Sequence, residues 1–300
     1  MKKVLSVACA LCMTTAMLTG CGSSNNAGTA ATGEAQNSAA ASTTTEQAST
    51  ATDAGTTLIA LITMDSLDQH WVTLNEGAQK AAAELGVTVQ FMAPNTKDDA
   101  QQIECVNNAV SAGAQAIIVA ANGPDAISSA LREASDAGVK LIYVDSPANV
   151  SAEATFSTDN NAAGKTAGEE MKKALADAGV TSGSIGIINV NAATDSCVMR
   201  EEGFRSAFEG TDFELLETQY GEGDAAKSQS IAENYITQGV VGIFGCNEGS
   251  TTGAGNAIKA SGKDNVIGVG FDKSDAILGL IDDGYLLCTC LLYTSPSPRD

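Results

Sequence analysis

Short apolar runs rich in Val, Ile, Leu and Phe recur along the body of the chain and constrain its fold more than any other feature. Several of them are apolar almost throughout, which is typical of strands in a parallel sheet covered on both faces. Segments with helical spacing separate the runs, so the pattern predicts repeated β-α-β units and a doubly wound α/β architecture. The runs are Leu58–Ile62, Val87–Phe91, Ala116–Ala120, Leu141–Val144, Ile185–Val190, Phe213–Leu216, Val240–Phe244, Val266–Val269 and Leu286–Leu291.

The intervening segments carry apolar stripes and helix-ending glycines. The first three stripes are Trp71, Leu74, Ala78, Ala81 and Leu85; Ile103, Val106 and Val110; and Ile127, Leu131 and Ala134. Residues at this spacing share one face of a helix, which is then expected to pack on a sheet. A glycine near a helix end and just before the next strand favours a left-handed C-terminal turn. Glycines in such places are Gly86, Gly113, Gly138, Gly179 and Gly239.

The chain also repeats one order of features. In each half a glycine precedes a strand, an Asn, a helix, a second strand and an Asp. The Asn-to-Asp interval is 23 residues from Asn122 to Asp145 and 25 residues from Asn247 to Asp272. Two similar halves predict two lobes of the same fold. Since ligands bind at the carboxyl ends of strands in open α/β sheets, we expect these four side chains to converge on one cleft.

Charge and histidine content exclude several functions. Acidic residues number 36 against 16 basic ones, which disfavours binding to nucleic-acid phosphates. Only one histidine, His70, is present, so zinc sites with several histidines are excluded. Gly164-Lys165-Thr166 resembles the end of a phosphate-binding loop, but the glycine that this motif needs is replaced by Asp159, so a helix start is expected. We therefore predict no catalytic residues, no metal and no cofactor.

The first 57 residues have the pattern of a signal peptide followed by a tether. Met1-Lys2-Lys3 is followed by a largely apolar stretch to Leu18, too short for a membrane span but typical of a signal peptide. Leu18-Thr19-Gly20-Cys21 resembles the lipobox of bacterial lipoproteins, which implies a signal peptide over residues 1–20 and a lipidated Cys21. The alternative is an ordinary signal peptide with a chance cysteine.

Residues 22–55 contain none of the large apolar side chains and no cysteine, so this stretch cannot bury enough apolar surface to fold. Residues 21–57 are thus interpreted as a lipid-bearing tether. Removing residues 1–20 takes Lys2 and Lys3 from the 16 basic residues, and the remaining 14 face 36 acidic ones, a net charge of −22. A body with this charge is not attracted to an anionic bilayer, so the membrane is expected to be contacted only through the lipid.

The body resembles the ribose/galactose class of bacterial solute-binding proteins, extracytoplasmic receptors that deliver sugars to ABC transporters. The resemblance runs from about Thr57 to Thr289. Its motifs are Asp68-Gln69-His70-Trp71, Glu76-Gly77-Ala78, Val144-Asp145, Thr158-Asp159-Asn160, Arg200-Glu201-Glu202-Gly203-Phe204, Cys246-Asn247-Glu248 and Val269-Gly270-Phe271-Asp272. It implies a type I periplasmic-binding-protein-like fold, in which two doubly wound lobes joined by hinge strands close on a sugar.

The resemblance also implies the domain limits. The N-terminal lobe is expected at 58–157 and the C-terminal lobe at 158–289, with hinge crossings near 156–159, 246–250 and 288–292. In this family a long helix and another strand follow the last hinge strand, whereas here Pro296 and Pro298 exclude a helix. We therefore expect the family's C-terminal helix and strand to be missing, and residues 290–300 to be a non-native tail.

The resemblance assigns seven residues to a sugar site: Asp68, His70, Trp71, Asp145, Arg200, Asn247 and Asp272. Rings pack on the apolar faces of a sugar, and charged side chains bond its hydroxyls. Each residue has a plainer alternative. Trp71 could anchor the first helix, His70 could lie at a surface helix start, Arg200 could pair with neighbouring glutamates, and the aspartates could be turn or capping residues.

Two departures separate this chain from the ribose binders. Ser146 stands where they carry an arginine beside the Asp, and Gly223 stands where they carry an aromatic residue. Both differences change the shape of the site, and the second removes a ring. The interpretation therefore keeps a sugar as the ligand without assigning ribose.

The predicted function is capture of a sugar by a monomeric, extracytoplasmic lipoprotein that hands it to an ABC permease. The same fold would also serve a sensor that passes its liganded state, with a quorum signal or polyol bound, to a signalling partner. A hydrolase-type enzyme on this scaffold is the third alternative, but no Gly-x-Ser-x-Gly motif is present. Five cysteines of the body, at positions 105, 197, 246, 288 and 290, are interpreted as small apolar side chains.

Overall fold

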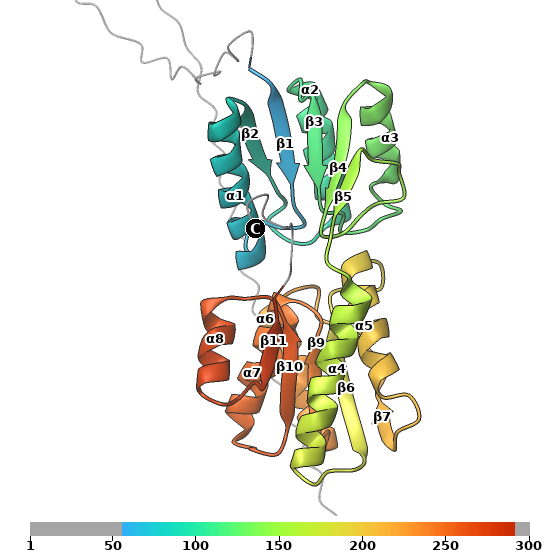
Figure 1. Ribbon diagram of the computed structural model, residues 1–300, viewed down its shortest axis with the longest axis vertical. Coiled ribbons are helices and arrows are strands. Elements are labelled where there is room, and N and C mark those ends of the chain that lie inside the picture. Colours follow the sequence, from blue (N-terminus) through green and yellow to red (C-terminus); the bar gives the residue numbers. More distant parts are fainter. Residues whose placement is uncertain (1–55, 292–300) are drawn as a thin grey trace, which may run out of the picture. The chain divides into compact units, whose positions relative to one another are not determined.

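The computed structural model of the protein describes residues 56–291, which form two parallel sheets flanked by helices (Figure 1). The predicted signal peptide, Cys21, nearly all of the predicted tether, and the tail beyond residue 291 lie outside the described residues. We call the part built on the first sheet the N-lobe and the part built on the second sheet the C-lobe.

The N-lobe has a five-stranded sheet with strand order β2-β1-β3-β4-β5, all pairs parallel. Its strands are β1 (Leu58–Ile62), β2 (Thr88–Met92), β3 (Ala116–Val119), β4 (Lys140–Val144) and β5 (Ala154–Phe156). Its helices are α1 (Gln69–Leu85), α2 (Asp99–Ser111) and α3 (Ser128–Asp136).

The C-lobe has a six-stranded parallel sheet ordered β11-β10-β9-β6-β7, and β8 also pairs with β6. Its strands are β6 (Gly183–Asn189), β7 (Phe213–Leu215), β8 (Gln219–Tyr220), β9 (Gly242–Gly245), β10 (Ile267–Phe271) and β11 (Cys288–Cys290). Its helices are α4 (Asn160–Asp177), α5 (Asp195–Ala207), α6 (Ala225–Gln238), α7 (Glu248–Ser261) and α8 (Asp275–Asp282).

The predicted fold class, two doubly wound lobes of parallel strands, is confirmed. Each of the nine apolar runs overlaps a strand, and all five predicted glycines have positive φ angles between 68° and 92°. Two strands were not predicted: β5, with three residues, and β8, with two exposed residues. Neither strand contains an apolar run long enough to be recognised in the sequence. Each is defined only by its backbone pairing with a neighbouring strand, β4 for β5 and β6 for β8.

The expected hinge crossing near residues 246–250 is wrong. These residues connect β9 to α7, and α7 packs on β9 and β10 of the same lobe. The segment therefore stays within the C-lobe, because a β-α connection brings the chain back onto its own sheet. The crossing from β5 to α4, at residues 157–159, coincides with the expected first hinge.

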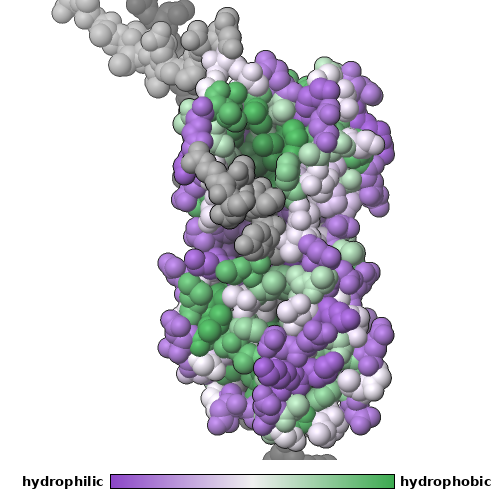
Figure 2. Space-filling model, viewed as in Figure 1, coloured by the Kyte–Doolittle hydropathy of each residue, from purple (hydrophilic) through white to green (hydrophobic). Residues whose placement is uncertain are grey.

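The main core of the N-lobe lies on one face of its sheet. Helices α2 and α3 cover this face through Val106, Ala109 and Leu131, which pack on Ile117 and Leu141. On the opposite face Ile59, Ile118 and Ile142 are only partly buried, and apolar surface is visible over this lobe (Figure 2).

The predicted apolar stripe of α1 lies on that second side of the lobe and is not fully covered. Trp71 and Ala82 are buried, but Ala81 is exposed and Leu85 is 75% exposed. Since helical spacing reports only that a face is apolar, the stripe predicted the helix correctly but not its degree of burial.

Helices α4 and α5 of the C-lobe cross closely because glycines lie at the contact. A Cβ atom on Gly164 would lie 2.0 Å from the carbonyl oxygen of Arg200, and one on Gly203 would lie 2.0 Å from that of Asn161. Any side chain at either position would force the helices apart. This crossing sets the position of Arg200, which lies on α5.

Candidate functional site

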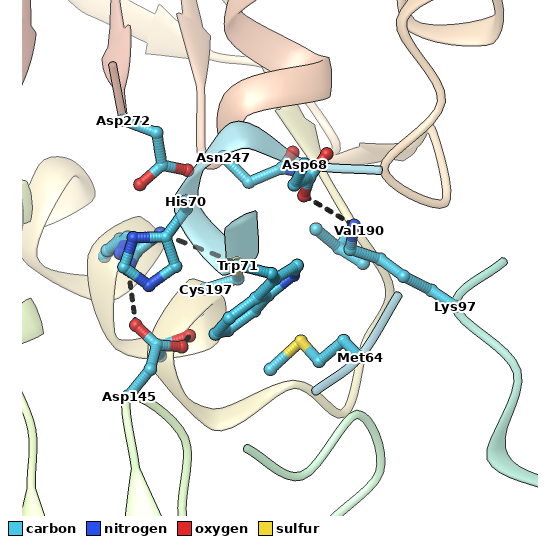
Figure 3. Close-up of a pocket in the computed structure, with 12 residues that line it drawn as sticks. Met64, Asp68, His70, Trp71, Lys97, Asp145, Val190, Cys197, Asn247 and Asp272 are labelled. Atoms are coloured by element: carbon cyan, nitrogen blue, oxygen red, sulfur yellow. Dashed lines mark hydrogen bonds and ion pairs between the residues drawn. The ribbon is translucent and has the colours of Figure 1, made fainter. Parts of the chain in front are cut away.

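A small cavity of about 20 Å³ is lined by residues of both lobes (Figure 3). All seven residues predicted from the sequence line it, and the structure adds five others. The lining residues are Met64, Asp68, His70, Trp71, Lys97, Asp145, Val190, Ser196, Cys197, Arg200, Asn247 and Asp272. The structure thus brings the predicted residues together, while their contact with a ligand stays a prediction.

Two buried aspartates enter the pocket from the strand ends of opposite lobes. Asp145 follows β4 and Asp272 follows β10, and Figure 3 shows them on opposite sides of the His70 ring. Both have left-handed backbone conformations, with φ angles of 60° and 72°. Such angles are uncommon for residues other than glycine, although Asp adopts them more readily than most, and residues in strained conformations cluster at ligand-binding sites.

Arg200 is the buried cation of the site, and its side chain is only 2% exposed. Its Nη2 lies 3.3 Å from Oδ1 of Asp145, its Nε donates to Oδ1 of Asn160 at 2.9 Å, and its Nη1 donates to the carbonyl of Cys246 at 2.9 Å. The guanidinium is also 4.5 Å from the centre of the Phe271 ring. The plainer alternative, a surface pair with Glu201, is wrong, because Arg205 makes that pair.

Two rings at the start of α1 form the aromatic part of the lining. Trp71 is buried, and its indole meets the imidazole of His70 edge-on with ring centres 4.6 Å apart. Because both rings face the pocket, Trp71 is at once a core anchor and a lining residue. An aromatic face combined with nearby carboxylates suits a molecule with both apolar C–H faces and hydroxyls.

Four buried polar atoms at the pocket have no hydrogen-bond partner among the described residues. They are Nε2 of His70, Nε1 of Trp71, Nδ2 of Asn247 and Oδ1 of Asp272. Buried polar groups are nearly always paired in folded proteins, so a group of four around one cavity fits a polar ligand. Asn247 is already fixed by its other amide atom, since Oδ1 caps α7 and accepts from the backbone N–H of Ser250 at 3.1 Å.

Lys97, between β2 and α2, is the most important residue that sequence reasoning missed. Its Nζ donates to Oδ2 of Asp68 at 2.7 Å and also bonds a carboxylate oxygen of Asp65. Its side chain is 6% exposed. The sequence carries no signal for this role, because Lys97 is distant from both aspartates along the chain and stands in a polar loop.

Burial and the charges of Asp65, Asp68 and Lys97 shift the pKa values of these three residues. Burial raises the pKa of Asp68 to about 6, and the neighbouring Asp65 adds to the increase, although Lys97 opposes it. Burial would also raise the pKa of Asp65, but Lys97 and two backbone N–H groups outweigh it and lower that pKa. Despite its burial, Lys97 has a raised pKa beside Asp68 and Asp65 and stays charged.

Glu248, at the start of α7, joins the two lobes beside the pocket. Its Oε2 accepts from the backbone N–H of Gln69, the first residue of α1, at 2.9 Å. Burial raises the pKa of Glu248 to about 7, and the charges of Asp68 and Asp272 raise it further. A second contact between the lobes runs from the hydroxyl of Thr194 to the carbonyl of Asn122 at 2.7 Å.

Asn122 does not line the pocket, although the repeat predicted that it would. Its Nδ2 donates to Asp99 at 2.6 Å, and its backbone oxygen meets Thr194. A pattern of spacing places a residue at a strand end but does not decide whether its side chain points into the cavity or along the lobe interface.

The two departures from the ribose binders have visible consequences. The hydroxyls of Ser146 and Ser196 lie 2.7 Å apart, and both are within hydrogen-bond distance of Oδ2 of Asp145. Ser146, which stands where the ribose binders carry an arginine, thus helps Ser196 to orient the carboxylate of Asp145. Gly223 lies against the side chain of Lys97.

Among residues 56–291 no group of His, Cys, Asp and Glu side chains is arranged to hold a metal ion. Within the same range, each helix is too short or too polar to cross a bilayer. The five cysteines of this range are free thiols, of which Cys197 and Cys246 are buried.

Comparisons with known proteins agree with the fold. Residues 59–294 match the family described as periplasmic binding protein domain. The ribose import binding protein of Haemophilus influenzae is 29% identical over 244 residues, which are 80% of this chain and 81% of that protein. A carbohydrate transporter solute-binding protein from Agrobacterium radiobacter, solved in complex with D-arabinose, is 26% identical with a TM-score of 0.74, over 78% of this chain and 82% of that one.

One further structure shares the fold. XylFII, which has been solved in a complex with LytSN, has a TM-score of 0.73 and covers 80% of this chain and 88% of its own. Its identity to this chain is 24%, so the likeness concerns the fold alone.

Proposed function

Because the chain belongs to the periplasmic binding protein family, we propose that it captures a sugar between its two lobes and delivers it to an ABC transporter. Relatives in this family bind sugars for transport and catalyse no reaction, and the chain is not an enzyme. The observation that carries the proposal is the composition of the pocket: two aromatic rings, buried carboxylates and a buried guanidinium around one small cavity.

Each part of the lining has a role in holding a sugar. The indole and imidazole rings pack on C–H faces, which are apolar. The carboxylates of Asp145 and Asp272 accept bonds from hydroxyls, and Arg200 offers N–H donors to a ring oxygen or to neighbouring hydroxyls. Because bonds to charged groups are stronger than neutral ones, these residues orient the ligand as well as hold it.

The charge of the pocket favours a neutral sugar. Its lining carries three carboxylates, Asp68, Asp145 and Asp272, against the cations Lys97 and Arg200, and both cations are already paired with carboxylates. A phosphorylated or carboxylated sugar would meet this acidic surface with no free cation to neutralise it. Ribose itself is not assigned, because Ser146 and Gly223 depart from the ribose-binding pattern.

The family implies that the protein works outside the cytoplasm. We further propose that residues 1–20 are a lipoprotein signal peptide and that a lipid on Cys21 anchors the body, through residues 21–57, to the cell membrane. The protein is proposed to act as a monomer, since a single chain supplies both lobes of the pocket.

The test is a ligand screen on the full chain without its signal peptide. Isothermal titration calorimetry with pentoses, hexoses, polyols and a furanosyl quorum signal should find a neutral sugar with micromolar or tighter affinity. A ligand that binds the folded state alone also raises the melting temperature. Binding of amino acids with no response to any sugar or polyol would refute the proposal.

A further inference from the structure

Lys97 of the N-lobe and Gly223 of the C-lobe meet at the edge of the pocket: Lys97 lines the pocket, and both residues line the open depression beside it. An ideal Cβ on Gly223 would lie 2.7 Å from Cδ, 2.8 Å from Nζ and 2.9 Å from Cε of Lys97. The lysine side chain therefore occupies the space that a side chain at position 223 would need. Gly223 also has a φ angle of +74°, in the region that favours glycine.

The ammonium group of Lys97 is held in this place from one side only. Its two hydrogen bonds go to Asp65 and Asp68, both in the loop between β1 and α1 of its own lobe. An ammonium has three N–H donors, so one donor remains beyond these two bonds. Lys97 lines the same pocket as Trp71 and Asp272, so its side chain borders the cavity with one donor not used by these two bonds.

We propose that Lys97 contacts the bound sugar and closes the pocket against Gly223, so that this pair determines which ligands fit. The inference rests on the proposed function. The third N–H of Lys97 donates to a ligand hydroxyl, while Asp65 and Asp68 fix the ammonium in a single position. The wall that Lys97 forms over Gly223 limits the length of the ligand on this side of the cavity.

The absence of a side chain at position 223 is essential to this arrangement. A lysine can swing away from a new methyl group, but only by giving up its bonds to Asp65 and Asp68 or its place over the cavity. Gly223→Ala should therefore weaken sugar affinity by about tenfold. The matched control is Gly210→Ala: Gly210 is also in the C-lobe, has a φ angle of +71° and has nothing within 4 Å of an added Cβ.

A double-mutant cycle separates the contact from backbone strain. Both glycine variants carry the same strain at positive φ, so only Gly223→Ala should lose affinity. In a Lys97→Ala background the added methyl meets no lysine, and Gly223→Ala should cost at most about twofold more. Equal losses from Gly223→Ala with and without Lys97 would overturn the proposed contact.

Ligand selectivity shows whether Lys97 contacts the sugar or only neutralises the carboxylates of Asp65 and Asp68. Lys97→Met keeps an unbranched side chain but removes the N–H donors and the charge. We expect it to change the ratio of affinities for D-ribose and D-arabinose, which differ at one hydroxyl, by about tenfold. The control is Lys80→Met, which removes a lysine charge at an exposed position of α1 and should leave this ratio unchanged. A uniform loss for both sugars in Lys97→Met would overturn the role in selectivity.

A measurement without sugar keeps the inference separate from the proposed function. The rate at which N-hydroxysuccinimidyl acetate acylates Lys97, followed by mass spectrometry, should be at least about tenfold below that of exposed Lys80, and Gly223→Ala should raise it. If the wild-type protein binds no sugar, the proposed function fails, and the acylation rate still decides the Lys97–Gly223 contact. Acylation of Lys97 as fast as that of Lys80 would overturn it.

Discussion

Asp145 and Asp272 have the same backbone conformation and the same backbone hydrogen bonds in the two lobes. The N–H of Asp145 donates to the carbonyl of Phe156, and that of Asp272 donates to the carbonyl of Cys290, both at 2.9 Å. Their own carbonyls accept from the hydroxyls of Ser157 at 2.8 Å and Thr289 at 2.7 Å. In each lobe the next strand therefore holds the aspartate in its left-handed conformation and directs its carboxylate into the pocket.

Replacing either aspartate should abolish sugar binding, but with different effects on stability. Asp145→Ala leaves the buried guanidinium of Arg200 without its carboxylate, which we expect to lower the free energy of unfolding by about 3 kcal/mol. Asp272→Ala breaks no ion pair but removes the acceptor of the Glu248 N–H, so it should cost less, about 1–2 kcal/mol. Calorimetric titration and urea unfolding of both variants check this difference. Normal sugar binding by either variant would remove that aspartate from the site.

Arg200→Lys should lose sugar binding although the charge is kept. A lysine cannot reproduce the separate bonds of the guanidinium to Asp145, Asn160 and the carbonyl of Cys246. We expect the free energy of unfolding to fall by about 2–4 kcal/mol, measured by urea denaturation. Lys165→Arg, at an exposed position of α4, is the control and should have no effect on either measurement.

The close crossing of α4 and α5 predicts a large effect from a single methyl group. Gly203→Ala would place Cβ against the backbone of Asn161, which cannot move without shifting α4. The expected loss in free energy of unfolding is about 1–3 kcal/mol. Gly77→Ala, in the exposed part of α1 with nothing within 4 Å of an added Cβ, should instead be neutral or stabilising by up to about 1 kcal/mol. Similar behaviour of the two variants would show that the crossing is not tight.

The raised pKa values of Glu248 and Asp68 predict that stability falls as pH rises. Both groups hold a proton to a higher pH in the folded protein, about 7 and about 6, than in the unfolded chain, near 4.5 and 3.8. The folded state thus binds more protons between these values, and the stability from this difference, present at pH 4, is lost by about pH 7.

Substitution of Glu248 tests the origin of this pH dependence. Glu248→Gln keeps an oxygen that can accept from the N–H of Gln69 but removes the titration. Melting temperatures between pH 4 and pH 8 should therefore decline less steeply in this variant than in the wild type. Glu233→Gln, at an exposed position of α6, should retain the wild-type slope. An unchanged slope in Glu248→Gln would exclude Glu248 as its source.

Lipid attachment at Cys21 predicts a simple change of location. Cys21→Ser removes the thiol that would carry the lipid, so the protein should move from the membrane fraction to the soluble extracytoplasmic fraction. The control is Cys105→Ser, a substitution in α2 that leaves the leader intact. Membrane binding of Cys21→Ser equal to that of the wild type would contradict the anchor.

The features that the sequence determined by itself are those with a local physical cause. Strands such as β1 and β9 follow from runs of apolar residues, and Gly86 and Gly239 end helices because they adopt positive φ angles without a side chain to clash. The seven site residues could be proposed because their motifs resemble those of the ribose/galactose class, while the Asn-to-Asp repeat places Asp145, Asn247 and Asp272 after strands. The strand and glycine signals extend over a few residues, whereas the resemblance depends on the order of motifs along the whole body.

Only the tertiary structure decided which of the remaining side chains reach the pocket. Lys97 lies about 30 residues from its partners Asp65 and Asp68 and more than 120 from Gly223, so no local pattern links them. Asn122 shows the converse, since its position in the repeat is right but its side chain bonds Asp99. The direction of a side chain at a strand end, and the neighbour that it meets, depend on how two lobes come together, which long-range packing determines.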